Sequence, residues 1–213
     1  MHRSRLINLQ WICRACVWAL IFTAPAGVAE EALTPHAIIE TTVTAVAERL
    51  DGRTAYYDEH RQELYALIDE LLLPHFDIRY AGYLVLGKHW ASASSDQRDR
   101  FIDVFYRFLL QSYANGILEF QQNTIIILPA DGEGQDEKRR VVRTEMRMDD
   151  GSEVPVNYSM RRSKAGWRVY DVRIEGISYI HNYRNQFNAE IAAVGVDAVI
   201  DRLNIVVAAA ASE

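Results

Sequence analysis

Three carboxylates, Asp77, Asp171 and Glu175, are the side chains of this sequence best suited to acid–base chemistry. A carboxylate serves as a general base when its surroundings bring its pKa close to the working pH. Asp171 stands between Val169 and Arg173 in an alternating segment, where an ion pair on the face of a strand is the simpler interpretation. The sequence therefore supplies candidate bases without a catalytic constellation around them.

Metal binding and nucleophilic catalysis have no recognisable motif. No two histidines after residue 30 have the i, i+3 or i, i+4 spacing of a helical zinc pair. The two cysteines, Cys13 and Cys16, both lie near the N-terminus, and the sequence has no Gly-x-Ser-x-Gly elbow. The composition therefore predicts neither a resident metal nor a cofactor.

The first 29 residues have the pattern of a secretory signal peptide. Arg3, Arg5 and Arg14 precede a short apolar run, and small residues follow it up to Ala29. A membrane anchor is the alternative, but the run is about half of the roughly 20 residues that a spanning helix needs. We therefore expect cleavage after Ala26 or Ala29, export to the periplasm, one domain over residues 30–204 and a tail over 205–213.

The charge of the chain argues against two classes of partner. The formal net charge is −6, and no Lys/Arg run interrupts the sequence. Nucleic-acid binding is therefore not expected, and neither is simple electrostatic docking to anionic membranes. Because both cysteines fall in the predicted signal peptide, the exported protein would be held together by its core alone.

Apolar residues with a helical period occupy both ends of the chain. Thr34 and Pro35 mark the start of a first helix that ends near Gly52, and a second helix is predicted over residues 55–73. A short helix over 78–86 precedes the longest one, over 98–119, which begins at a capping sequence in 94–97. After Gly176 the pattern predicts one more long helix and a short piece over 196–203.

Between residues 124 and 175 the apolar period changes to two, which predicts strands over 124–128, 139–148, 153–161 and 167–175. Short turns place Met146 opposite Val156 and Val142 opposite Met160, and then Tyr170 opposite Met160. All these apolar sets share one face, as the register of a half-buried sheet requires. The same alternation places Trp167 and Val169 on the other face.

The predicted fold is therefore α+β. It is an antiparallel meander of about four strands packed against several helices, in an arrangement like that of NTF2-like or cystatin-like folds. The pattern alone favours a close-packed core between the layers. An apolar cavity in the same place is the alternative.

Four segments, over residues 74–90, 100–120, 151–162 and 166–187, resemble the MlaC family, also called the toluene-tolerance family. The third reads GSEVPVNYSMRR and the last begins GWRVYDVRIEGISYI. The resemblance covers about residues 71–203. It implies a carrier of the periplasm, not an enzyme, which takes phospholipid acyl chains into an apolar cavity between sheet and helices. It also implies two partners, an inner-membrane MCE-domain ABC transporter complex and an outer-membrane lipoprotein complex, and no cofactor beyond phospholipid as cargo.

We expect the lipid-binding residues on the apolar face of the sheet and on the helices facing it. From the sheet they are Val156, Tyr158, Met160, Tyr170, Val172 and Ile174. From the helices they are Leu86, Trp90, Phe105, Phe108, Leu109, Tyr113, Tyr179, Tyr183 and Phe187. Three alternatives stay open: a periplasmic enzyme of NTF2-like fold with an Asp or His base in the pocket, a filled core without ligand, and a carrier of another apolar lipid such as a hopanoid or a quinone.

Overall fold

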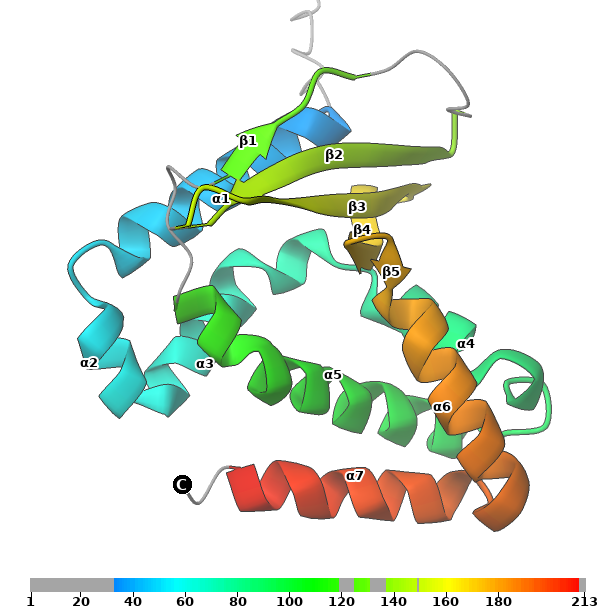
Figure 1. The fold of residues 1–213 in the computed structure, drawn as a ribbon. Coiled ribbons are helices and arrows are strands. Elements are labelled where there is room, and N and C mark those ends of the chain that lie inside the picture. The colour runs from blue at the N-terminus through cyan, green and yellow to red at the C-terminus, as the bar shows by residue number, and fades with distance from the viewer. Residues whose placement is uncertain (1–32, 119–124, 131–136, 149, 211–213) are drawn as a thin grey trace, which may run out of the picture. The chain divides into compact units, whose positions relative to one another are not determined.

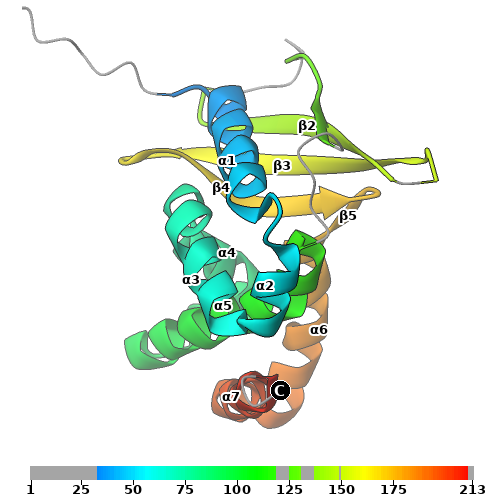
Figure 2. The same cartoon turned by 90° about the vertical axis from the view of Figure 1, so that its left-hand side faces the viewer.

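The computed structural model describes residues 33–118, 125–130, 137–148 and 150–210. The predicted signal peptide, both cysteines and the proposed cleavage sites lie outside the described residues. Helices and one antiparallel sheet form the described chain, with α3 to α7 lying together on one side of the sheet (Figures 1 and 2). The α+β class expected from the change of period is confirmed.

The N-terminal helices follow the predicted pattern with one break. Helix α1 (Pro35–Leu50) begins as predicted, with the Thr34 hydroxyl accepting a hydrogen bond from the Ala37 amide and Pro35 in the first turn. The expectation of a single helix over residues 55–73 is wrong. It is divided into α2 (Thr54–Glu59) and α3 (Arg61–Leu71), because His60 between them has φ −120° and ψ 61°, outside the helical region.

A short connection and two capped helices complete this half of the chain. The 3-10 turn η1 (Leu73–His75) leads to Asp77, whose carboxylate caps α4 (Ile78–Leu86) at the Tyr80 amide. The 3-10 turn η2 (Gly87–His89) follows. The predicted capping box is present at the start of α5 (Ser95–Leu118), where Ser94 and Gln97 each accept a bond from the other's amide.

The sheet has five strands in sequence order. They are β1 (Ile125–Ile127), β2 (Arg139–Arg147), β3 (Glu153–Ser163), β4 (Gly166–Ile174) and β5 (Ile177–Ser178). The two-residue strand β5 is the addition to the predicted meander. It folds back on β4 through the turn Glu175–Gly176, in which both residues have positive φ.

The predicted pairing of β2 with β3 was wrong by two residues. Val142 lies opposite Tyr158, and Met146 lies opposite Val154. The turn after β2 is tighter than expected, because Met148 bonds to both Ser152 and Gly151. A shift of two residues keeps each side chain on its face, so the predicted faces of these two strands survive the error.

A β-bulge in β4 corrects the predicted faces of that strand. Val172 and Ile174 pair with Tyr158 and Val156 as expected, but Met160 pairs with Val169 and leaves Tyr170 as the extra residue. Val169 is consequently 1% exposed and packs with Met160. Sequence alternation cannot reveal an inserted residue, which is why the faces of Val169 and Tyr170 were exchanged in the prediction.

Two helices end the chain. Helix α6 (Tyr179–Val194) is capped by the Ser178 hydroxyl and ends at Gly195, which has φ +88°. Helix α7 (Val196–Ala210) runs along α5. The predicted boundary after residue 204 falls inside α7, and Val207, which was placed in the tail, is buried.

Three apolar clusters hold the elements together. The largest joins α4, α5, α6 and α7 around Phe101, Phe105 and Phe187. A second joins α1, α2, α3 and α5. The third joins α1 to the sheet through Ile38 and Val142. The helices therefore have their own core, and α1 is the helix that covers the sheet face.

Candidate functional site

The candidate site lies on the face of the sheet that meets α1, which we call the inner face. Pairing places on it the alternate side chains of β2, β3 and β4. They are Arg140, Val142, Thr144, Met146, Val154, Val156, Tyr158, Met160, Arg162, Trp167, Val169, Val172 and Ile174. Arg140 and Arg162 lie at the end next to the β3–β4 turn, and apart from Thr144 the rest of the inner face is apolar or aromatic.

Burial differs across the inner face. Val142 and Met160 are fully buried and pack with Ile38 and Ile39 of α1, and Thr144 and Val156 are buried as well. Tyr158, Val172 and Ile174 are half-buried. Beyond Ile174, its β5 partner is exposed (Ile177, 63%). Helix α1 thus closes one part of the inner face and leaves an open part.

The polar side chain in the middle of the inner face, Thr144, has its hydrogen bond satisfied within the sheet. The Thr144 hydroxyl is fully buried and donates a hydrogen bond of 2.8 Å to the carbonyl oxygen of Val156. Burial raises the pKa of the neighbouring Tyr158 hydroxyl, so this side chain stays neutral. The inner face therefore carries no charge at its centre, as binding of an acyl chain requires.

Tyrosines of α5 and α6 stand at the beginning of α6, next to β5. Tyr113 packs edge-on against Tyr179 with ring centroids 4.9 Å apart, and its hydroxyl lies 2.8 Å from that of Tyr183. Burial and the hydrogen bond to Tyr183 raise the pKa of the Tyr113 hydroxyl far above its ordinary value. Tyr179 directly follows β5, so this tyrosine wall, in which Tyr183 is buried and Tyr113 and Tyr179 are half-buried, lies next to the last strand of the sheet.

The remaining predicted helical residues belong to the helical core. Leu86, Phe105 and Phe187 are fully buried, and the rings of Phe105 and Phe187 meet edge-on at 5.9 Å. Phe108 and Leu109 lie half-buried at the edge of this core. Side chains packed on all sides by protein stabilise the fold. They reach a ligand only if the helices separate.

Two predicted residues lie away from the inner face. Tyr170, the bulge residue, packs edge-on against Tyr80 of α4. Trp90 packs edge-on against Tyr83 and beneath the guanidinium of Arg98. The predicted set thus divides into an inner-face group, a tyrosine wall, a buried helical core and these two outlying rings.

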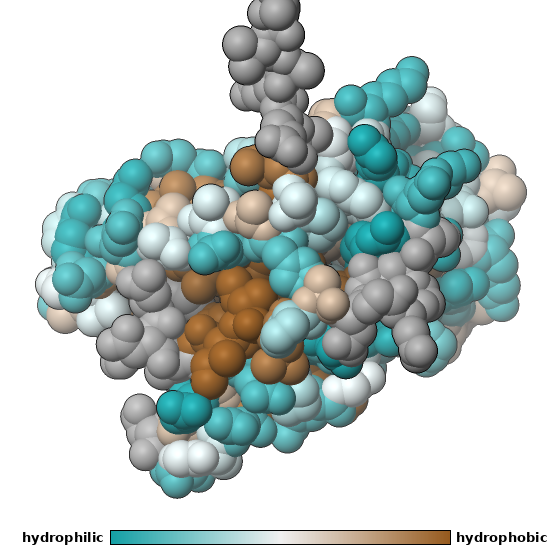
Figure 3. Space-filling view, turned by 90° about the horizontal axis from the view of Figure 1, so that it is seen from above, coloured by the Kyte–Doolittle hydropathy of each residue, from teal (hydrophilic) through white to brown (hydrophobic). Residues whose placement is uncertain are grey.

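The surface of the protein also shows where apolar side chains gather. Seen from the side on which β1 lies in Figure 1, a continuous brown area is bordered by hydrophilic side chains (Figure 3). All three isoleucines of β1 are half-buried, and Ile125 and Ile127 pair with inner-face residues of β2. These β1 residues extend the inner face and were not selected from the sequence, although their apolar run signals them.

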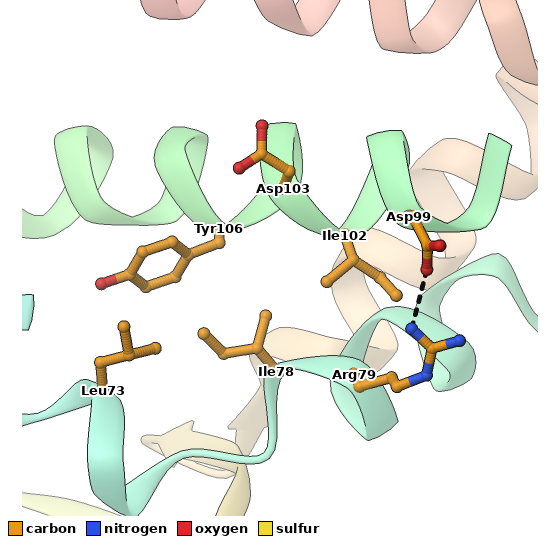
Figure 4. Close-up of a pocket in the computed structure, with 7 residues that line it drawn as sticks. All are labelled: Leu73, Ile78, Arg79, Asp99, Ile102, Asp103 and Tyr106. Carbon is orange, nitrogen blue, oxygen red and sulfur yellow. Dashed lines mark hydrogen bonds and ion pairs between the residues drawn. The ribbon is translucent and has the colours of Figure 1, made fainter. Parts of the chain in front are cut away.

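A separate slot of about 370 Å³ lies between α5 and the η1–α4 segment. Figure 4 shows Leu73 and Ile78 pointing from one side towards Ile102 and Tyr106 on the other. Asp103 and an ion pair of 2.8 Å between Arg79 and Asp99 complete its lining. None of the predicted lipid-binding residues lines this slot.

A more polar hollow of about 440 Å³ lies at the β4–β5 turn and the first turns of α6. Its lining is Arg173, Gly176, Ile177, Ser178, His181, Asn182 and Asn185. Ile177 belongs to it and also pairs with Ile174. Ile177 lies on the inner face, whereas Arg173 and Ser178 lie on the other face, so the hollow is at the β5 edge of the sheet.

The two aspartates considered as bases have structural partners. Asp77 caps α4 and forms an ion pair of 2.6 Å with Arg161. Asp171, 6% exposed, accepts hydrogen bonds from the Ser178 hydroxyl and the Ile180 amide at the start of α6. The ion pair expected for Asp171 is a loose contact of 3.6 Å with Arg173. Within the part of the chain that the structure describes, no cluster of three or more His, Cys, Asp or Glu is placed to hold a metal.

Comparison with known proteins places the chain in a family. The model of the MlaC protein family matches residues 40–205, which is most of the sequence. The chain belongs to the MlaC family. Among the members of known name, the toluene tolerance protein ttg2D of Pseudomonas putida is 28% identical over 157 residues, covering 73% of this chain and 72% of the relative.

A second relative of the MlaC family is the intermembrane phospholipid transport system binding protein MlaC of Haemophilus influenzae. It is 22% identical over 172 residues, covering 79% of this chain and 80% of the relative. The solved structure of a phospholipid-binding protein from Ralstonia solanacearum, in complex with a phospholipid, superposes with a TM-score of 0.75 at 26% identity. It covers 84% of this chain and 99% of that protein. No helix within the described ranges has both the length and the apolar content to cross a membrane.

Proposed function

We propose that this MlaC-family protein is a carrier that binds phospholipid through its acyl chains. The observation that carries the proposal is the inner face of the sheet, which is apolar and without charge from Met160 to Ile174 and is only half-buried at Tyr158, Val172 and Ile174. The acyl chains lie along Tyr158, Val172 and Ile174, and the tyrosine wall of α5 and α6 borders them. The phospholipid bound by the similar Ralstonia protein supports the same ligand class.

The energetics explain why a carrier is needed. Burying one CH₂ group is worth about 0.8 kcal/mol, so an acyl chain of roughly 16 carbons exposed to water would cost on the order of 12 kcal/mol. A phospholipid leaving a membrane must therefore have its acyl chains covered by protein throughout the transfer. Burial alone meets this requirement, without a catalytic group.

The proposed setting is the periplasm. The N-terminal pattern of residues 1–29 supports export. The name of the Haemophilus relative supports a place in an intermembrane transport system. The partners we propose are an inner-membrane MCE-domain ABC transporter complex and an outer-membrane lipoprotein complex, between which the protein carries phospholipid. The structural roles of Asp77 and Asp171 favour a carrier over an enzyme.

The test compares charges placed on opposite faces of the same sheet. Ile174→Glu puts a carboxylate on the open part of the inner face. Val141→Glu puts one on the other face, where Val141 is 41% exposed. Phospholipid that copurifies without detergent is extracted and counted per protein molecule. We expect Ile174→Glu to lower the lipid content at least tenfold and Val141→Glu to leave it unchanged.

A second variant guards against loss of the fold. Ile177→Glu changes a side chain that is already 63% exposed and that shares the face of Ile174, so we expect it to fold. Normal lipid content in folded Ile174→Glu and Ile177→Glu would refute the assignment of the acyl chains to this face. Extraction of a hopanoid or a quinone in place of phospholipid would keep the carrier and change its cargo.

A further inference from the structure

Strand pairing gathers basic side chains at one end of the sheet, which we call the basic end. Its residues are Lys138, Arg139, Arg140, Arg161, Arg162, Lys164 and Arg168. They come from the beginning of β2, the end of β3, the β3–β4 turn and the beginning of β4. Figure 2 shows this turn at the left-hand end of the sheet. Residues 138–141 and 159–168 contain no acidic side chain.

Three arginines stand side by side across the strands. Arg139 pairs with Arg161, and Arg161 pairs with Arg168, so they form one row on the face opposite the inner face. Like charges directly opposite one another destabilise a sheet. Asp77 compensates for one of them through its ion pair with Arg161. Arg139 donates a hydrogen bond to the Tyr80 hydroxyl and Arg168 donates one to the carbonyl oxygen of Pro74, so each guanidinium group of the row is held in position.

The turn next to this row adds cations available to a partner. Arg162 and Lys164 are exposed, and neither takes part in an ion pair among the described residues. Arg140 lies over the ring of Trp167, with its guanidinium carbon 5.7 Å from the ring centroid. Arg161 is held in the same way over Tyr80, at 4.2 Å. Aromatic rings thus hold two of the guanidinium groups in place.

The overall charge of the chain makes this end distinctive. The protein has a formal net charge of −6, so seven cations at one end of the sheet must be balanced by an acidic remainder. Such an asymmetric distribution orients a protein as it approaches a charged partner and raises the rate of association. The sequence alone does not reveal the cluster, because strand pairing assembles it from two separate segments, residues 138–140 and 161–168.

We propose that the basic end is a docking surface for an acidic protein surface. Five of its seven cations are arginines, whose planar guanidinium groups bind carboxylates through paired hydrogen bonds. They project from paired strands at fixed spacing, which suits carboxylates that are themselves fixed on a folded partner. Arg161, held between Asp77 and Tyr80, shows this mode of carboxylate binding within the chain.

A protein partner fits this end better than an anionic bilayer does. Proteins that bind bilayers peripherally combine basic residues with exposed apolar or aromatic side chains that enter the lipid. The exposed residues of the β3–β4 turn are Arg162, Lys164 and Ala165, and Trp167 is half-buried beneath Arg140. Val141 is the one large apolar side chain exposed within residues 138–141 and 159–168, so the basic end offers many charges for contact and little apolar surface for insertion.

The test reverses two charges at this end and two elsewhere. Arg162→Glu/Lys164→Glu changes the exposed cations of the basic end. Arg53→Glu/Lys88→Glu changes two exposed cations of the helices by the same net charge. Binding of the full chain to a fluorescent polyglutamate peptide, a probe that presents carboxylates alone, is measured by anisotropy at low and at moderate salt. Flotation with vesicles of phosphatidylglycerol and phosphatidylcholine is measured beside it.

We expect the wild-type protein to bind polyglutamate with an affinity that falls as salt rises. The basic-end variant should bind at least tenfold more weakly, and the helix variant should bind as the wild type does. No binding by the wild type, or equal losses in both variants, would overturn the proposal. Binding to the anionic vesicles but not to the peptide would overturn it in favour of a bilayer. Lipid content measured on the same variants tests the carrier function separately, since Arg162 and Lys164 lie at the opposite end of β3 and β4 from Val156 and Ile174.

Discussion

The close approach of α4 to α5 gives a prediction whose sign depends on the packing. Gly82 lies in the middle of α4, and a Cβ atom added there would stand 2.7 Å from Cγ1 of Ile102 in α5. Real Cβ atoms essentially never approach this closely, so either the Ile102 side chain or the helices themselves must shift. Gly116, near the end of α5, would place its Cβ in open space with nothing within 4 Å.

The same substitution should therefore have opposite effects at the two positions. Alanine in place of glycine favours a helix by up to about 1 kcal/mol, and Gly116→Ala should gain most of this. Gly82→Ala gains it too, but overpacking costs about 1–3 kcal/mol. We expect a net loss of about 1 kcal/mol for Gly82→Ala and a gain of about 0.5 kcal/mol for Gly116→Ala, where the helix is near its end.

Urea denaturation with a common m value measures both changes in the free energy of unfolding. Ile102→Ala serves as the partner in a double-mutant cycle, because it removes Cγ1, the atom closest to the added methyl group. Gly82→Ala should cost less in the Ile102→Ala background than in the wild type. If Gly82→Ala proves as stabilising as Gly116→Ala, or if the cycle shows no coupling, the packing of α4 on α5 described above is wrong.

Three further predictions concern the β4–β5 region and η1. Glu175 has φ +50° in a turn that favours asparagine, so Glu175→Asn should raise the free energy of unfolding by about 0.5–1 kcal/mol, and a decrease would contradict the turn geometry. Asp171→Ala should lower the free energy of unfolding by about 2 kcal/mol, because two donors at the start of α6 lose their acceptor. Lipid content should stay normal, and lipid loss in a folded variant would point to a functional role for this carboxylate. Burial, assisted by Arg168, lowers the pKa of His75, so the unfolded chain takes up its proton first and stability should fall as pH drops below about 6.5. Melting curves at pH 7.5 and 5.5 should show a smaller difference for His75→Gln than for the wild type, and an unchanged difference would assign the pH dependence elsewhere.

The sequence predicted the ends of helices correctly where a single capping or terminating residue determines the boundary. The Thr34 cap, the capping box from Ser94 to Gln97 and the end of α4 at Gly87 were all placed from the sequence. The break at His60 was missed because the apolar period continues across it. The backbone conformation of His60 results from tertiary packing, and helix propensity along the sequence does not predict it.

The sheet shows a similar division between local and tertiary information. Alternation identified the inner-face residues of β2 and β3 despite the error in pairing, because a shift of two residues conserves the face. The bulge at Tyr170 exchanged the faces of Val169 and Tyr170, and no local pattern announces an inserted residue. For the same reason, the sequence could not separate Phe187, which fills the helical core, from Tyr158, which lies on the inner face: both are large apolar residues at the expected period.

Carriage of phospholipid by its acyl chains is tested most directly by native mass spectrometry of protein purified from the periplasm without detergent, followed by extraction and analysis of any bound lipid. We expect a bound mass that resolves into diacyl phospholipid. Freshly prepared, folded protein that shows only its own mass would contradict it.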